Sequence, residues 1–358
     1  MTDGRDGLDR DKLEKRIDAF SQVHLLVMGD VVLDEYLYGE VDRVSPEAPV
    51  PVVHVRRESV LLGGAGNVVR NIVALGGRCS FCSVVGNDAD GDRVLELIEQ
   101  LSVPTDAIVR VEGRPTTRKT RVVARSQQIV RFDRETREPF SDASADQVLA
   151  ALEALARSTP SQSSARRFAG AVLEDYGKGL FSPSTIQQTM TILRDAGLPV
   201  AVDPKGELAA YRGAALVKPN LREAEALTGI AVAGPDDLAR LVRELRRQVG
   251  DADVVVTRGG DGMSVFEGSQ PGVDVRTATQ QVYDVQGAGD TAIAALALAQ
   301  RAGASLVEAA VIANAAAGAV VQKVGTATAS PDEVRALLPA AIEAAGVLSS
   351  RRFSAEPK

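Results

Sequence analysis

The sequence predicts an α/β fold with a central, mostly parallel sheet and helices on both faces. Short apolar runs recur along the chain and end in small or polar residues, which is typical of strands buried on both faces. These runs are 23–30, 80–86, 168–175, 198–206, 214–220 and 252–260. Helical segments follow most of them, at 89–101, 183–196, 221–228 and 235–249. This alternation indicates β-α-β units.

In such a sheet, ligands bind at the carboxyl ends of the strands. The loops that follow the predicted strands carry Asp30, Asp175, Lys205, Asn220 and Gly259. We therefore expect these residues to gather at one edge of the sheet.

Two regions, 36–64 and 114–135, alternate polar and apolar residues instead, as strands with one solvated face do. Together they predict a small antiparallel β lid, formed by about 36–62 and 114–133. Alternation puts Lys119, Arg121 and Arg125 on one face, and Arg131 joins them after the turn at "SQQ". The alternative is a purely solvated face.

The rest of the chain completes one domain. An amphipathic helix precedes the first strand, and residues 136–167 predict a surface helix followed by a loose connection. We expect a single domain over 1–350 and a tail over 351–358.

Composition excludes several classes of protein. Of the 358 residues, 45% are hydrophobic and 25% charged, as in globular proteins, and the formal charge is -7, which disfavours binding to nucleic acid. No run of about eighteen apolar residues occurs, and the N-terminus is charged where a signal peptide would be apolar. We expect a cytoplasmic protein that binds neither nucleic acid nor a membrane.

Cys79 and Cys82 form a C-x-x-C pair, which is found in redox and metal sites. A metal site would need further ligands, but His24 and His54, the only histidines, lie in separate apolar runs. We interpret the cysteines as small side chains on a strand.

The stretch "DVQGAGDT" (284–291) carries the most chemistry. Gly287, Ala288, Gly289 and Asp290 precede the alanine-rich helical segment 291–301, with Asp290 near its cap. The free N–H groups of a helix start bind anions, and small residues let a phosphate approach the backbone. Asp290 could then accept the proton of an attacking hydroxyl. The alternatives are a simple helix cap and a dinucleotide loop, whose G-x-G-x-x-G spacing is missing.

With these motifs in hand, the chain resembles the ribokinase-like (PfkB) carbohydrate kinases, from about residue 20 to 335. The motifs that carry the resemblance appear in the family's order: "GDVVLDEYLYG", "RVSPEAPVPVV", "GGAGNVVRNIVALG", "EDYGKG", "DPKG", "KPNLREAE", "VTRGGDGM", "DVQGAGDT" and "NAAAGAVVQKVGT". The second motif, followed by "GGAGN", is most similar to the subgroup that acts on D-glycero-β-D-manno-heptose 7-phosphate. The resemblance implies a ribokinase-like three-layer α/β/α fold.

The resemblance also implies roles for individual residues. Asp290 matches the catalytic base, and Gly287, Ala288 and Gly289 match the anion hole. Asn220 and Glu223 match the motif that binds Mg2+, partly through water, although "NLRE" alone reads as a helix cap. ATP and Mg2+ are the implied cofactors, and a monovalent cation such as K+ is a further candidate.

For the nucleotide, the loop over the ribose and phosphates is implied at Thr257, Arg258, Gly259 and Gly262. Asn314 and Gly318 match part of the adenine wall. Lys205 is expected to meet a phosphate, with an exposed loop lysine as the alternative.

For the sugar, Asp34 matches the carboxylate that accepts two sugar hydroxyls, with Asp30, Gly63, Gly64 and Asn67 beside it. Strand-end surface acids are the alternative for Asp30 and Asp34. A phosphorylated sugar also needs a basic receptor. The candidates are Arg43, Lys119, Arg121, Arg131 and Lys178.

The resulting prediction is an ATP-dependent kinase that phosphorylates O1 of the heptose 7-phosphate and forms a homodimer through the lid. The alternatives are a PfkB kinase of another sugar phosphate and a sugar-binding regulatory protein. The chain departs from the family at Gln286, where threonine is usual. Either Gln286 bonds the same neighbours, or the turn before the anion hole is held differently.

Overall fold

The computed structural model describes residues 8–125, 127–158, 168–279 and 282–347, and over these residues it contains two sheets. The large sheet has ten strands. In spatial order they are β14 (Ala345–Val347), β13 (Val273–Val275), β12 (Met263–Phe266), β11 (Asp253–Thr257), β10 (Leu216–Val217), β9 (Val200–Asp203), β8 (Gly170–Glu174), β1 (His24–Gly29), β4 (Arg78–Gly86) and β5 (Ile108–Val111). Neighbours from β11 to β5 are parallel, and β12, β13 and β14 are antiparallel. The mostly parallel sheet that the sequence predicts is therefore confirmed.

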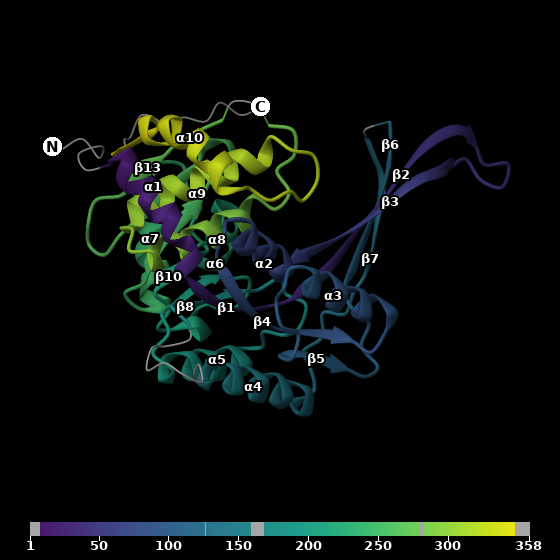
Figure 1. Ribbon diagram of the computed structural model, residues 1–358, viewed down its shortest axis with the longest axis horizontal. Helices are drawn as coiled ribbons and strands as arrows, with labels where there is room; N and C mark the ends of the chain where they lie inside the picture. The colour runs from purple at the N-terminus through teal and green to yellow at the C-terminus, as the bar shows by residue number, and fades with distance from the viewer. Residues whose placement is uncertain (1–7, 126, 159–167, 280–281, 348–358) are drawn as a thin grey trace.

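Helices cover both faces of this sheet (Figure 1). They are α1 (Arg10–Asp18), α2 (Ala65–Ala74), α3 (Ala89–Gln100), α4 (Asp142–Arg157), α5 (Pro183–Asp195), α6 (Leu221–Thr228), α7 (Pro235–Val249), α8 (Ala288–Arg301), α9 (Leu306–Val321) and α10 (Pro331–Glu343). Three short 3-10 helices, Ala19–Gln22, Leu208–Tyr211 and Gly259–Asp261, lie in the connections. Among the described residues, no helix combines the length and the apolar character needed to cross a bilayer. The loose connection expected before residue 168 lies outside the described residues.

Strand β1 shows why there are three layers. Leu25 and Val27 pack into the core beneath α2, α8 and α9, whereas Leu26 and Met28 pack into the core beneath α4, α5 and α7. Because successive side chains of a strand point to opposite faces, a strand that is apolar throughout must be covered on both sides.

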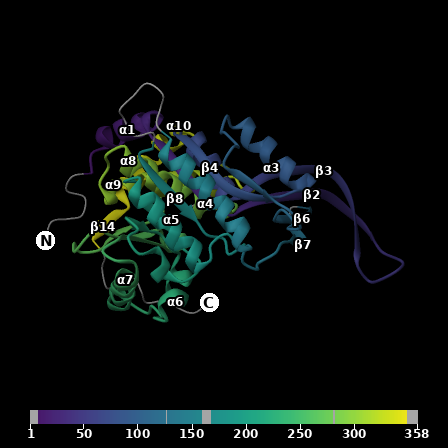
Figure 2. The ribbon, with the colours of Figure 1, turned by 90° about the horizontal axis from the view of Figure 1, so that it is seen from below.

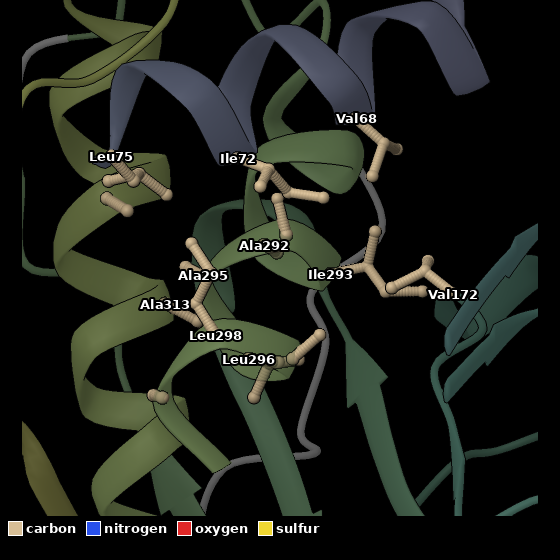
Figure 3. Close-up of a cluster of buried hydrophobic side chains, with 14 of the residues drawn as sticks. Val68, Ile72, Leu75, Val172, Ala292, Ile293, Ala295, Leu296, Leu298 and Ala313 are labelled. Carbon is tan, nitrogen blue, oxygen red and sulfur yellow. The ribbon is translucent and has the colours of Figure 1, made fainter. Parts of the chain in front are cut away.

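Helix α8 is the centre of the first core (Figure 3). Ala292 and Ile293 face Ile72 of α2 and Val172 of β8, and all four side chains are buried. A helix that is apolar all round belongs in the interior of a protein. The alanines of α8 let α2 and α9 pack closely against it, which fixes the position of its first turn.

The lid is a second, four-stranded sheet in the order β3 (Pro51–Gly64), β2 (Val31–Val44), β6 (Arg118–Ala124) and β7 (Gln127–Arg134). It projects away from the body (Figures 1 and 2). Its pairs are antiparallel except for the central pair β2–β6, which is parallel. Ser126 of the expected turn lies outside the described residues.

The lid joins the body at the switch point of the large sheet. From β1 the chain builds β4 and β5 on one side, and it later builds β8, β9, β10 and β11 on the other. A crevice forms where the direction of building reverses, and ligands bind there. Asp30 follows β1 and Asp175 follows β8 at this point, and β2 begins directly after Asp30, at Val31.

The two cysteines lie on β4, and both are free and buried. Cys79 belongs to the core under α2 and α8, and Cys82 belongs to the core under α4 and α5. Three residues apart on a strand, the two thiols point to opposite faces of the sheet. Burial raises the pKa of both thiols, that of Cys82 to about 12. This arrangement agrees with their interpretation as small strand residues.

Candidate active site

Asp290 lies in the first turn of α8, at the centre of the carboxyl edge of the sheet. The helix begins at Ala288, three residues earlier than the sequence indicates, and Gly287 is its N-cap. The carboxylate of Asp290 is buried and accepts two hydrogen bonds: Asn67 Nδ2 donates to Oδ2 at 2.7 Å, and Tyr176 Oη donates to Oδ1 at 2.6 Å. It is therefore held between α2 and the loop after β8.

The environment of Asp290 shifts its protonation in two opposing ways. Burial raises the pKa of the carboxyl group, while the hydrogen bonds from Tyr176 and Asn67 lower it, and the net pKa is raised. A carboxylate with a raised pKa is a stronger base than an exposed aspartate. Its two donors fix its direction without neutralising it.

The turn before Asp290 has no room for a side chain at Gly287. Gly287 is in the left-handed region, with φ 76°, and a Cβ there would lie 2.6 Å from Asn67 Nδ2. A Cβ on Gly289 would lie 3.8 Å from Lys218 Nζ. The amides of this first turn point out of the helix end, next to a lysine, and such an arrangement binds anions.

A cavity of about 270 Å3, open to solvent, adjoins this turn. It brings together many of the residues predicted to bind the nucleotide or its phosphates: Asn220, Thr257, Gly259, Gly262, Ala288, Gly289, Asn314 and Gly318. This volume lies just below the range of about 300–1,000 Å3 that is usual for small-molecule sites. The cavity has a mainly apolar wall, from Val282, Val285 and Val321, and ends at the helix start. The apolar wall suits the adenine ring of a nucleotide, and the helix start suits its phosphate chain.

Three of the predicted nucleotide residues have other tasks in the structure. Arg258 does not face the cavity: its guanidinium forms a buried ion pair with Asp274 at 2.9 Å. The amide of Asn314 donates to the carbonyl of Arg276, so Asn314 braces the wall that it lines. Lys205 stays half exposed, 3.4 Å from Glu223.

Asn220 and Glu223 form a capping box at the start of α6. Asn220 Oδ1 accepts from the amide of Glu223, and Glu223 Oε2 accepts from the amide of Asn220. The reading of "NLRE" as a cap is therefore correct in geometry. The box also points Glu223 toward a cluster of buried acids.

That cluster consists of Glu174, at the end of β8, and Asp203, at the end of β9, with Lys218 after β10. Lys218 is fully buried and its Nζ lies 2.5 Å from Asp203 Oδ2. Glu174 Oε2 is buried without a hydrogen-bond partner among the described residues. Burial and the charge of Asp203 raise the pKa of Glu174. Such crowding of carboxylates favours a nearby cation.

On the sugar side, Asp34 is buried on β2 against the bare backbone of β3. A Cβ on Gly63 would lie 2.0 Å from Asp34 Oδ2, so only glycine fits there. Arg121 of β6 donates to Asp34 Oδ1 at 2.5 Å. Gly64, with φ 57°, leads β3 into α2, which presents Asn67 to Asp290.

Asp30 differs from our expectation of a sugar ligand. Its Oδ2 accepts from the backbone amides of Tyr176 and Lys178, and burial raises its pKa to about 6. Asp30 thus anchors the loop that carries Tyr176. Gly64 packs directly on its carbonyl oxygen.

The five candidate phosphate receptors fall into different places. Arg43 is exposed near the outer end of β2, roughly 30 Å of strand from Asp34 at about 3.3 Å per residue, and so lies away from this site. Lys178 forms an ion pair with Glu135 at 2.6 Å, and Arg131 forms one with Asp133, two residues further along β7, at 3.0 Å. Arg121 is bound to Asp34.

Lys119 is the remaining candidate. It is half buried, its Nζ lies 6.0 Å from the centre of the Tyr176 ring, and the described residues offer it no ion pair within 4.0 Å. Burial and the positive charge of Lys178 lower its pKa. The strand register places Lys119, Arg121 and Arg131 on the face that carries Asp34.

Sequence reasoning missed Tyr176, Lys218 and Arg70. The first two stand in "EDYGKG" and "KPNLREAE", directly after strands, where the position alone marks them as site residues. Arg70 donates to Asn67 Oδ1 at 3.0 Å. It follows Asn67 by three residues, a spacing that puts both on one face of a helix.

A fold of this kind, with an anion-binding helix start between a cavity and a buried carboxylate, defines a phosphotransferase of small molecules. A comparison with known families identifies it further. The model of the pfkB family of carbohydrate kinases matches residues 24–333. The chain belongs to this family and is thus a carbohydrate kinase, which transfers a phosphoryl group to an alcohol.

Several curated proteins are similar to the chain. It is 44% identical over 328 residues to "Bifunctional protein HldE" of Pelobacter propionicus, and 42% identical over 331 residues to the protein of that name from Geobacter metallireducens. Each match covers 91% of this chain and 65% of the relative. The chain therefore spans less than two thirds of these relatives.

Solved structures share the fold. Ribokinase of Arabidopsis thaliana with ribose and ATP has a TM-score of 0.68 and 22% identity, and covers 88% of this chain and 98% of its own. Phosphofructokinase-2 of Escherichia coli has a TM-score of 0.71 and 23% identity, with the same coverage. The ribokinase-like fold predicted from the motifs is confirmed.

We expect the crowding at Gly287 to be measurable. Gly287→Ala should lower the free energy of unfolding by about 2–5 kcal/mol, the sum of about 1–2 kcal/mol for a left-handed alanine and about 1–3 kcal/mol for the clash with Asn67. The matched control is Gly325→Ala, where φ is 79° but nothing lies within 4 Å of a Cβ. Urea unfolding of both variants measures the difference, and equal losses would contradict the packing described.

Proposed function

We propose that the protein transfers the terminal phosphoryl group of ATP to O1 of D-glycero-β-D-manno-heptose 7-phosphate. One observation carries the proposal: the Asp290 carboxylate lies between the cavity that ends at the start of α8 and the buried sugar-side residues Asn67 and Tyr176. A base in this place can reach an alcohol on one side while the helix start holds a phosphate on the other.

In the proposed reaction, Asp290 accepts the proton of the sugar hydroxyl as its oxygen attacks phosphorus. The backbone amides of Gly289 and Asp290, at the positive end of α8, stabilise the negative charge on the transferred group. Lys218 adds a fixed positive charge beneath this turn. Because phosphoryl transfer passes through a loose transition state, positioning and electrostatics supply most of the catalysis.

Magnesium is proposed to bind at Asn220 and Glu223, partly through water. There it would neutralise charge on the ATP phosphates. The unpartnered Oε2 of Glu174 adds negative charge near this position. Among the described residues, no group of three or more acids, histidines and cysteines is arranged so that it could hold a metal ion. Magnesium that keeps several waters and phosphate ligands needs no such group. A monovalent cation remains a prediction.

The choice of heptose rests on the resemblance of "RVSPEAPVPVV" and "GGAGN" to the heptose kinase subgroup. The relatives named HldE support it, since they match over most of this chain. A kinase for another sugar phosphate, such as a hexose 6-phosphate, is the second candidate, and the shared fold with phosphofructokinase-2 favours it. We also propose a single kinase domain with a β lid, working in the cytoplasm, where ATP is available.

The phosphate already present on the sugar is proposed to bind Lys119. This ammonium group stands on the Asp34 face of the lid, next to Tyr176, and is not neutralised by a described carboxylate within 4.0 Å. An unpaired, half-buried cation gains more from an anionic ligand than an ion-paired one does, because no existing pair is broken.

The central test combines a substrate panel with one substitution. Formation of ADP is measured with the heptose 7-phosphate, hexose 6-phosphates and pentose phosphates, and we expect a clear preference for the heptose. Asp290→Asn should lower kcat by about 10^2–10^4-fold, with ATP affinity by calorimetry almost unchanged. Asp332→Asn, on an exposed surface, is the control. If Asp290→Asn phosphorylated the sugar near the wild-type rate, Asp290 would not be the catalytic base.

Lys119→Met tests the phosphate receptor. The KM for the sugar phosphate should rise about 10–100-fold, because a charged hydrogen bond contributes about 1.5–3 kcal/mol, while the KM for the unphosphorylated sugar should hardly change. The matched control is Arg131→Met, on the same face but paired with Asp133. If Arg131→Met raised the KM for the sugar phosphate more than Lys119→Met does, the assignment of the phosphate to Lys119 would be wrong.

The lid is proposed to bind the lid of a second copy. Val130 and Phe132 are about half exposed on β7, an edge strand exposed along its whole length, and they lie on the face opposite to Arg121. An exposed edge with apolar side chains is a surface that proteins normally cover. A second lid offers the same edge and the same side chains.

Sedimentation of the wild-type chain should then show a dimer, and Phe132→Ser should shift it toward the monomer. The control Val324→Ser alters a side chain that is more exposed but lies off the lid. A wild-type monomer at micromolar concentration would refute the dimer.

A further inference from the structure

Gln286, which directly precedes Gly287, touches the lid. Its Oε1 accepts a hydrogen bond of 2.6 Å from the hydroxyl group of Tyr36, which lies on β2. The same hydroxyl group lies 3.2 Å from Thr326 Oγ1. Tyr36 is buried and Gln286 is partly buried, so this contact is partly shielded from water. A lid strand is thus bonded to the residue directly before Gly287.

Tyr36 also lies beside the sugar-side residues Asp34 and Arg121. It lies two residues after Asp34, so both side chains are on one face of β2. Arg121, which donates to Asp34 at 2.5 Å, lies 5.2 Å from the centre of the Tyr36 ring. In the strand register Tyr36 and Arg121 are direct neighbours.

Main-chain hydrogen bonds also hold the turn at Gln286: the amides of Tyr283 and Asp284 donate to the carbonyl of Val321, and the amide of Ala288 donates to that of Val285. The amide of Gln286 donates to Asp284 Oδ1, and Asp284 Oδ2 accepts from the amide of Gly325. Gly287 then packs against Asn67 and Thr326 without a Cβ. Packing places the first turn of α8, and the bond from Tyr36 to the Gln286 side chain links the residues just before that turn to the lid.

We propose that Tyr36 and Gln286 are a positioning pair that couples the lid to the anion hole. When a sugar binds Asp34 and Arg121, β2 is fixed, and Tyr36 fixes the turn whose amides meet the transferred phosphoryl group. A threonine side chain is two bonds shorter than glutamine and would not reach Tyr36. The inference rests on the proposed phosphoryl transfer, and it adds that the arrangement of the anion hole depends on the lid.

A double-mutant cycle tests the pair with the sugar phosphate that the wild-type protein prefers. Tyr36→Phe and Gln286→Leu should each lower kcat about fivefold to tenfold, with both KM values within about twofold, because the amides act on charge that develops in the transition state. The double variant should lose no more than either single variant. Gln286→Thr, whose side chain would not reach Tyr36, should lower kcat as much as Gln286→Leu does.

Tyr38→Phe is the matched control, since Tyr38 stacks on Tyr36 at 6.0 Å on the same strand and its loss of a hydroxyl should leave kcat unchanged. Losses that multiply in the double variant, or a wild-type kcat in Tyr36→Phe, would overturn the coupling. The same double-mutant cycle is measured on the slow hydrolysis of ATP in the absence of sugar. Independent effects of the two substitutions on this rate would also overturn the proposed coupling. A wild-type chain that phosphorylates no sugar refutes the proposed function instead.

Discussion

The structure depends on the burial of one carboxylate at the start of a helix. Asp290 can be buried because Asn67 and Tyr176 each donate a hydrogen bond to it, and these two residues come from opposite sides of the crevice. Burying a charge without partners would be prohibitively unfavourable. The need to satisfy Asp290 therefore ties α2, the loop after β8 and α8 together, and the same bonds aim the carboxylate at the space between them.

A second theme is the use of charge in pairs that face a common centre. Lys218 with Asp203, and Arg121 with Asp34, are buried ion pairs on either side of Asp290. Buried pairs contribute little net stability, because desolvation offsets their attraction. Their value here is direction: each leaves a charged group with a fixed position toward the phosphates or the sugar, and neither has to reorganise when ligands arrive.

The sequence predicted the layers and most of the edge on which the site lies, because apolar runs such as 23–30 are unambiguous and parallel strands end together. It did not predict β12, β13 and β14, which have three or four residues each and leave no clear periodicity. Among site residues, the motif glycines and Asp290 lie where the sequence places them, at the start of α8, whereas Arg258 and Asp30 form contacts that the sequence did not indicate. Their partners, Asp274 and the amides after β8, are distant in sequence, so only the folded chain reveals them.

The placement of the two thiols has an experimental consequence. Cys79 and Cys82 sit back to back in one strand, each covered by a different helical layer, and neither can ionise readily while covered. An alkylating reagent would reach either sulfur only when its own layer lifts. Two single-thiol versions of the chain would thus report separately on the opening of the two halves, and would reveal whether they detach together or in turn.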